Sequence, residues 1–154
     1  MRLITIFLLF IAVGLNAQAP NLEYVTDEGV QNLSENQGKV IYLSFWASWC
    51  KPCIQNFKKY QSMREQLAAE GVQLLNISID KDPSNWDKAI EKYDFIIGEN
   101  GLANDINKVM QDFNITKTPD YHIINKRGEF VFLSDDYDRD IVAEFRAWVA
   151  EEHE

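Results

Sequence analysis

Two cysteines separated by two residues, Cys50 and Cys53, lie where an apolar strand pattern gives way to a helical pattern. They are the only cysteines in the chain of 154 residues. A thiol at the N-terminus of a helix is shifted toward its thiolate, because unpaired backbone N–H groups and the helix dipole stabilise negative charge there. Such thiols have pKa values of roughly 3.5–7.5, against about 8.5 for a free cysteine. The arrangement therefore predicts a strand, a tight loop and a helix built around a reversible dithiol–disulfide pair.

The first nineteen residues predict a secretory signal peptide. Arg2 supplies a positive charge, residues 3–15 are almost wholly apolar, and small residues follow at Ala17 and Ala19, with cleavage favoured near Ala17. A retained membrane anchor is the alternative, but this apolar run falls short of the roughly 20 residues that cross a bilayer. We therefore expect an exported, periplasmic or otherwise extracytoplasmic domain over residues 20–154, with no stable membrane insertion after cleavage.

The length and the net charge of the chain limit its number of domains and its possible binding partners. A chain of this size forms one domain that can bury a core without disulfide staples. The net charge of −9 disfavours nucleic acid and anionic membranes, which bind basic patches. An exported protein can carry a structural disulfide, but a loop this small restrains the unfolded chain very little. A stapled secreted fold would also contain more cysteines. These arguments favour a redox-active pair.

Apolar residues recur with strand and helix periods along the chain. Strands are predicted over residues 40–46, 72–79, 121–124 and 130–133, the last two forming a hairpin that turns at Gly128. Helices are predicted for a short stretch within residues 21–37, capped by Thr26 or Asp27, and over residues 52–70, 84–93, 102–113 and from Asp138 or Asp140 onward, with a loop at 98–101.

The helix between the first two strands makes them parallel, joined by a right-handed crossover. A parallel pair followed by an antiparallel hairpin gives a mixed sheet. The predicted fold class is therefore α/β, a three-layer arrangement with a central sheet of about four or five strands flanked by helices.

This order of elements, with the cysteine motif between strand and helix, resembles the thioredoxin fold. More narrowly, the chain resembles the exported TlpA-like and ResA-like thiol–disulfide oxidoreductases. The resemblance covers essentially the whole chain after the leader. It implies an enzyme whose only redox group is the Cys50–Cys53 disulfide, with no cofactor and no metal. It rests on residues 42–53 (YLSFWASWCKPC), 72–82 (VQLLNISIDKD) with Trp86, 114–121 (NITKTPDY) and 125–128 (NKRG).

The resemblance also implies a role for each residue of the motif. Cys50 is expected to attack a partner's disulfide, and the more buried Cys53 then resolves the mixed disulfide, which leaves the partner reduced. Lys51 adds positive charge that favours the Cys50 thiolate. Pro52 stiffens the turn and removes one N–H donor.

Residues outside the cysteine motif are expected to shape the substrate site. Trp49 is expected beside Cys50 as an apolar platform, whereas Trp46 belongs in the core because of its place in a buried strand. By resemblance, Pro119 is cis and faces the cysteines. The backbone of Thr118 then lies open to an extended substrate segment that pairs as an added strand.

The chain departs from the resemblance at Ser44. Thioredoxins carry a buried aspartate six residues before the first cysteine, and a serine hydroxyl cannot accept the proton of Cys53 effectively. ResA-like proteins often use a glutamate after the second strand, so Asp80, or else Asp82, is a candidate proton acceptor. Each of these residues could equally cap the next helix, and the proton acceptor stays open.

The function expected from the resemblance is reduction of disulfides in envelope proteins, with a membrane thiol reductase as electron donor. The direction stays open, because potentials in this fold span from about −270 mV to about −120 mV. A thioredoxin-fold binding module with little redox turnover is one alternative. A peroxidase would usually carry a lone reactive cysteine beside an arginine and a threonine.

Metal binding is the other alternative. Copper handling would suit the thiolates, but Met63 and Met110 lie on helix faces typical of a core. A zinc site would need His122 and His153, which lack zinc-finger spacing.

Overall fold

The computed structural model describes residues 17–131, so most of the predicted leader and the last predicted helix lie outside the described residues. The described part forms a mixed seven-stranded sheet in the order β2-β1-β5-β4-β3-β6-β7. Its elements are β1 (Glu23–Thr26), β2 (Gly29–Asn32), the 3-10 helix η1 (Leu33–Asn36), β3 (Ile41–Trp46), α1 (Lys51–Lys59), α2 (Gln61–Ala69), β4 (Gln73–Ser78), α3 (Pro83–Lys92), β5 (Glu99–Ala103), α4 (Ile106–Asp112), β6 (Asp120–Ile124) and β7 (Phe130–Val131).

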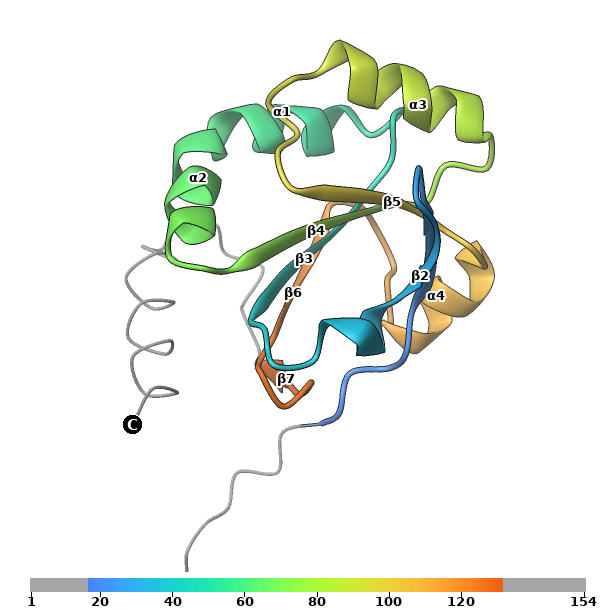
Figure 1. Ribbon diagram of the computed structural model, residues 1–154. Coiled ribbons are helices and arrows are strands. Elements are labelled where there is room, and N and C mark those ends of the chain that lie inside the picture. Colours follow the sequence, from blue (N-terminus) through green and yellow to red (C-terminus); the bar gives the residue numbers. More distant parts are fainter. Residues whose placement is uncertain (1–16, 132–154) are drawn as a thin grey trace, which may run out of the picture.

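Helices cover both faces of this sheet, with α1, α2 and α3 on one side and α4 on the other (Figure 1). Strand β3 lies inside the sheet, parallel to β4 and antiparallel to β6. All six of its residues are buried, because both of its faces are covered. The three-layer α/β class and the parallel pair joined by a helical crossover are confirmed.

The sheet has seven strands in the described range rather than the four or five expected, because the strands β1, β2 and β5 were not predicted. The stretch predicted as a short helix is the hairpin β1–β2 followed by η1. Its buried residues Leu22 and Tyr24 alternate with exposed ones, which is a strand period. Val30, an apolar residue within the predicted helix, is exposed on β2.

The third misassigned segment is β5, expected as a loop followed directly by a helix. Gly101 is buried there, and a Cβ at this position would lie 2.5 Å from Cδ2 of Tyr24. Glycine therefore permits the close approach of β5 to the ring on the neighbouring strand β1. Helix α4 begins later than predicted, at Ile106, where the Asp105 side chain accepts the N–H of Lys108 as an N-cap.

The long helix predicted after the cysteines is divided at Tyr60, whose φ and ψ are −103° and 15°. Helix α1 buries Cys53 and Phe57, and α2 buries Arg64 and Leu67. The two short helices thus present separate buried faces to the same side of the sheet.

The core is divided by the sheet. Leu43 and Phe45 of β3 face α4 and pack with Phe113, while Trp46 faces α1. Trp46 is fully buried, and its ring meets Phe57 edge-on at 5.5 Å between centroids. The expectation that Trp46 belongs to the core is confirmed.

Residues 17–19 run beside the hairpin turn. The Phe130 N–H donates to the Ala17 carbonyl, and the Ala19 N–H donates to the Gly128 carbonyl. Among residues 17–131, none of the helices has the length and apolar character that crossing a bilayer requires.

Candidate active site

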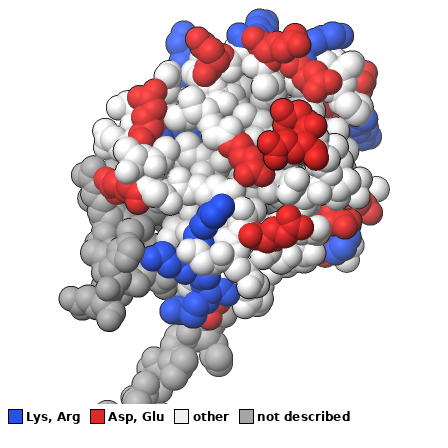
Figure 2. All heavy atoms as spheres, in the orientation of Figure 1, with Lys and Arg blue, Asp and Glu red and all other residues white. Residues whose placement is uncertain are grey.

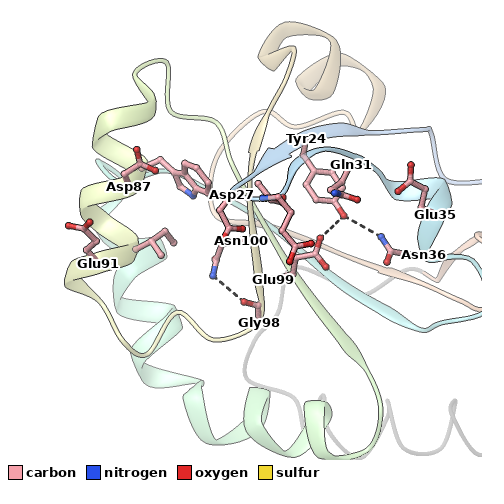
Figure 3. A pocket seen from close by; sticks show the side chains of 14 residues that line it. Tyr24, Asp27, Gln31, Glu35, Asn36, Asp87, Glu91, Gly98, Glu99 and Asn100 are labelled. Carbon is pink, nitrogen blue, oxygen red and sulfur yellow. Dashed lines mark hydrogen bonds between the residues drawn. The ribbon is translucent and has the colours of Figure 1, made fainter.

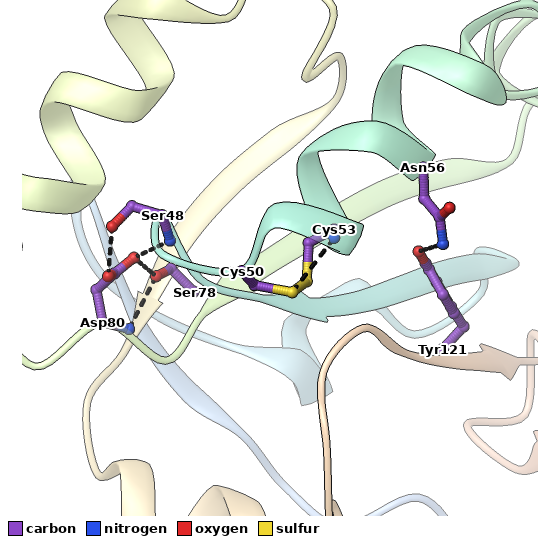
Figure 4. The surroundings of a disulfide bond; sticks show 7 residues. All are labelled: Ser48, Cys50, Cys53, Asn56, Ser78, Asp80 and Tyr121. Atoms are coloured by element: carbon purple, nitrogen blue, oxygen red, sulfur yellow. Dashed lines mark hydrogen bonds between the residues drawn. A yellow bond between two sulfur atoms is a disulfide. The ribbon is translucent and has the colours of Figure 1, made fainter.

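Cys50 and Cys53 are joined in a disulfide, with their Cα atoms 5.3 Å apart (Figure 4). Cys50 is the N-cap of α1, and its Sγ accepts the Cys53 N–H at 3.2 Å. Pro52 lies in the first helical turn, where its missing N–H costs no intrahelical bond. The helix-terminus position and the pairing expected for the cysteines are confirmed.

The two sulfur-bearing residues differ slightly in exposure: Cys50 is 4% exposed and Cys53 is fully buried. Trp49 is 66% exposed next to them, and Lys51 and Pro52 are exposed as well. Cys50 is therefore the more accessible of the two to an external partner. The roles assigned to the three neighbours stay predictions.

The segment predicted to bind the substrate chain lies directly before β6. The Thr118–Pro119 peptide bond is cis, as the resemblance implied, and both residues are half-buried. Asp120, the next residue, is the register partner of Phe45 near the end of β3. The Thr-Pro segment therefore lies near the carboxyl end of β3, where the chain enters the loop before Cys50.

Helix α1 is also linked to this strand by a side-chain contact. The Asn56 side chain donates from Nδ2 to the Tyr121 hydroxyl at 3.3 Å (Figure 4). Asn56 lies one turn beyond Cys53, and Tyr121 lies two residues beyond Pro119. The contact therefore holds the cysteine helix against the strand that carries the Thr-Pro segment.

Asp80 anchors the CxxC loop (residues 47–50). Its carboxylate is buried, and Oδ2 accepts the Ser48 N–H at 2.8 Å and the Ser78 hydroxyl at 2.7 Å. Its other oxygen, Oδ1, accepts the Ser48 hydroxyl at 2.7 Å (Figure 4). Ser48 is two residues before Cys50, so Asp80 ties the end of β4 to the start of the redox motif.

The two candidate carboxylates of the β4–α3 connection thus have different partners. Asp82 caps α3 by accepting the Ser84 N–H at 3.0 Å, and this bond holds the pKa of Asp82 below its ordinary value. Asp80 caps no helix, so that alternative is wrong for Asp80 and right for Asp82. Proton acceptance from Cys53 stays a prediction for Asp80.

A buried arginine that was not predicted, Arg64, lies beside Ser44. Arg64 is 2% exposed, and its Nη1 donates to the Ser44 hydroxyl at 3.2 Å. Its Nη2 donates to Asn76 Oδ1 at 2.6 Å and to the Ile97 carbonyl at 3.1 Å. The position occupied by a carboxylate in thioredoxins therefore holds a hydroxyl bonded to a guanidinium.

Aromatic rings enclose the same guanidinium. Its carbon lies 4.9 Å from the ring centroid of Phe57 and 5.4 Å from that of Tyr42. The signal in the sequence was a charged residue on the apolar stripe of a helix, seven residues after Phe57 and three before Leu67. That stripe marks Arg64 as buried, but its partners come from three other segments.

His122 lies on the opposite face of the sheet from Arg64. Its Nε2 is 2.6 Å from Asp120 Oδ1, and its ring packs against Phe45, Phe113 and Phe130. Within residues 17–131, no group of three or more His, Cys, Asp or Glu side chains is placed to hold a metal ion. His153 lies outside the described residues.

A hollow of about 810 Å³ lies between α3 and the β1–β2 hairpin (Figure 3). Tyr24 lies buried at this hollow, and its hydroxyl donates to Glu99 at 2.8 Å. Burial and this bond raise the pKa of Tyr24 above its ordinary value. Figure 2 shows carboxylates gathered on this face of the protein. The carboxylates that line the hollow belong to Asp27, Glu28, Glu35, Asp87, Glu91 and Glu99.

Comparison with known proteins gives one family match. Residues 15–148 match the AhpC/TSA family. A thiol–disulfide oxidoreductase ResA of Geobacillus kaustophilus is 26% identical over 124 residues, which cover 77% of this chain and 67% of the relative. A ResA of Oceanobacillus iheyensis is 27% identical over 113 residues, which cover 73% of this chain and 57% of the relative.

Solved structures share the fold. The thioredoxin domain of a thiol-disulfide oxidoreductase from Bacteroides vulgatus superposes with a TM-score of 0.77 at 20% identity, covering 87% of this chain and 96% of that domain. The chain thus spans a whole domain of this fold. It spans between 57% and 67% of the length of the two ResA relatives.

Proposed function

The chain belongs to the AhpC/TSA family, and we propose that it is an exported reductant of protein disulfides. Its disulfide and its fold are those of a thioredoxin-like thiol–disulfide oxidoreductase. One observation carries the proposal. Cys50 is the N-cap of α1, its Sγ accepts the Cys53 N–H, and it is the more exposed of two joined cysteines. On reduction, a thiolate at this sulfur would lie at the positive end of the helix.

The reaction follows from this position. The Cys50 thiolate attacks one sulfur of the partner's disulfide, breaks that bond, and forms a mixed disulfide while one partner thiolate leaves. Cys53 loses its proton and attacks Cys50 Sγ, which releases the second partner thiolate and closes the Cys50–Cys53 bond. Two electrons pass to the partner, whose two thiolates take up two protons.

The substrate segment is proposed to lie between the cysteine helix and the start of β6. Trp49 offers an exposed apolar surface beside Cys50. Thr118 and Pro119 are half-buried at the same edge of the sheet and offer backbone groups to an extended chain. Lys51 and Pro52 adjust the thiolate and the turn. Asp80 remains the proposed proton acceptor for Cys53, in addition to anchoring the CxxC loop.

The direction and the location belong to the same proposal. Exported relatives with proline before the second cysteine are mostly reductants, and the leader of this chain favours export. We propose disulfides of envelope proteins as substrates and a membrane thiol reductase as electron donor. The mature N-terminus is expected at Gln18, and sequencing the N-terminus of protein from an extracytoplasmic fraction tests this. A retained leader would contradict the cleaved form.

The test of the function is the equilibrium potential of the Cys50–Cys53 pair, measured by thiol trapping across graded dithiol/disulfide buffers. A reductant is expected near or below about −270 mV, the value of thioredoxin. A value near about −120 mV would make the protein an oxidant instead. A pair that never cycles would refute the oxidoreductase itself. Cys50→Ser separates turnover from binding, because a binding module would still hold its partner without this thiol.

A further inference from the structure

A permanent positive charge is buried on the same side of the sheet as the redox pair. Arg64 reaches from α2 to the space between α1 and the sheet, and it is 2% exposed. Phe57, whose ring centroid is 4.9 Å from the guanidinium carbon, follows Cys53 by one helical turn on the buried face of α1. The Cβ atoms of residues four apart on a helix lie about 5–6 Å apart, and Phe57 packs in the same buried cluster as Cys53. One side chain therefore lies between the guanidinium and Cys53, which puts their separation on the order of 10 Å.

The guanidinium is held in place by groups from three segments. Ser44 of β3, Asn76 of β4 and the carbonyl of Ile97 accept its N–H groups. An arginine stays protonated at any working pH. The charge therefore stays the same in the oxidised and the reduced protein.

The charge of the cysteine pair does not stay the same. Reduction by a dithiol breaks the Cys50–Cys53 bond, adds two electrons and two protons, and leaves the donor as a disulfide. The disulfide is neutral, whereas the reduced pair carries negative charge whenever one thiol has lost its proton. A nearby buried cation favours that negative charge, so it stabilises only the reduced state.

From this geometry we infer that Arg64 is a positioning residue that sets the redox potential of the Cys50–Cys53 pair. The inference rests on the proposed function, and Arg64 itself touches neither sulfur in the proposed reaction. Two unit charges roughly 10 Å apart at an effective dielectric near 20 change the stability of a thiolate about tenfold. A tenfold change in the exchange constant is about 30 mV for this two-electron couple.

Other charges near the pair are placed differently. Lys51 and Lys58 of α1 are exposed, so water and salt screen them. The Asp80 carboxylate is buried, but it lies on the Cys50 side and is bonded to Ser48 and Ser78. Asp120 and His122 pack on the other face of the sheet. Among residues 17–131, Arg64 is thus the buried cation on the Cys53 side.

The test compares the potentials of Arg64→Met, which removes the charge, and Arg64→Lys, which keeps it. Lys58→Met is the matched control, because it removes an exposed charge from the helix that carries Cys53. Arg64→Met should lower the potential by about 30 mV. It should also raise the pH at which ultraviolet absorbance detects the thiolate by about one unit. Arg64→Lys should retain most of the wild-type value, and the control should match the wild type.

A purely structural role would destabilise both redox states equally and leave the potential unchanged. Arg64→Met that folds and keeps the wild-type potential therefore overturns the inference. If Arg64→Met does not fold, Ser44→Asp neutralises the guanidinium in place, since the serine hydroxyl is 3.2 Å from Nη1. It should lower the potential relative to Ser44→Asn, and equal values overturn the inference. A wild-type pair that never cycles would instead refute the proposed function.

Discussion

Replacing Asp80 with Asn should loosen the CxxC loop at its start. Asp80 accepts three hydrogen bonds, two from Ser48 and one from Ser78, and it is 2% exposed. Asparagine keeps one acceptor oxygen but replaces the other with an NH2 group, so the Ser48 hydroxyl must turn to accept, and the negative charge that strengthens all three bonds is lost. Hydrogen bonds to a charged group contribute about 1.5–3 kcal/mol each, against about 0.5–1.5 kcal/mol for neutral ones, so weakening two or three of them should cost about 2–4 kcal/mol.

The assay is denaturant unfolding of the oxidised protein, with the slope m compared between variants to confirm that the same surface is exposed on unfolding. Asp82→Asn is the matched control. Asp82 is exposed, makes one cap bond to Ser84, and asparagine caps helices as well as aspartate does. Its free energy of unfolding should be close to the wild-type value. Asp80→Asn with wild-type stability would refute the anchoring role.

The same variant tests proton acceptance separately. If Asp80 takes the proton of Cys53, Asp80→Asn should slow the resolution of a trapped mixed disulfide between Cys50 and a partner. An unchanged resolution rate in a folded variant would exclude Asp80 as the acceptor while leaving its role as loop anchor intact. The two roles of Asp80 thus have different observables.

Other substitutions probe the reaction, the sheet and the pH dependence. Cys53→Ser should accumulate a mixed disulfide at Cys50, visible on non-reducing gels, and Cys50→Ser should accumulate none; adducts of equal amount would contradict the assigned order of attack. Gly101→Ala places a methyl group 2.5 Å from Tyr24 and should cost about 1–3 kcal/mol in unfolding free energy; a neutral result would show that β5 can move away from the ring. The raised pKa of Tyr24 means that the folded state favours its neutral phenol, so this stabilisation is complete below the ordinary value of 10.0 and is lost as pH rises beyond it. Unfolding measured between neutral and strongly alkaline pH should therefore show a steeper loss in the wild type than in Tyr24→Phe, and equal slopes would contradict the assignment.

The centre of the fold could be predicted because its signals are local. Residues 40–46 form a continuous apolar run, and the helix that follows begins at the cysteine motif. Gly128, with a φ of 79°, marks the turn of the hairpin. Each of these features depends on residues close together in the sequence, so a pattern along the chain is sufficient.

Strand β5 could not be predicted in the same way. Strand β5 contains Asn100 and Gly101, which are poor strand formers alone. It is a strand because it pairs with β4 on one side and β1 on the other. Only a glycine fits at position 101, because the ring of Tyr24 lies against it. Such pairing between distant segments overrides local propensity.

The candidate site shows the same limit. Asp80 was predicted to accept a proton or to cap a helix. Its bonds to Ser48 could not be predicted, because they form only when the end of β4 meets the CxxC loop. Ser44 was treated as the loss of an acid, although the structure pairs that hydroxyl with Arg64 from a different helix. In both cases the residue was noticed and its partner lay too far away in sequence.

Asp80 bonds to Ser48, before Cys50, and Arg64 lies against Phe57, after Cys53. These two buried charges have opposite signs, so removing each of them should shift the redox potential in a different direction. Removing a carboxylate near Cys50 favours the thiolate and should raise the potential, whereas removing the guanidinium below Cys53 should lower it. A packing defect at the site would shift the redox potential in a direction that does not depend on the sign of the removed charge. Asp80→Asn and Arg64→Met should therefore shift the potential in opposite directions, while shifts in the same direction would show that altered packing governs the redox equilibrium.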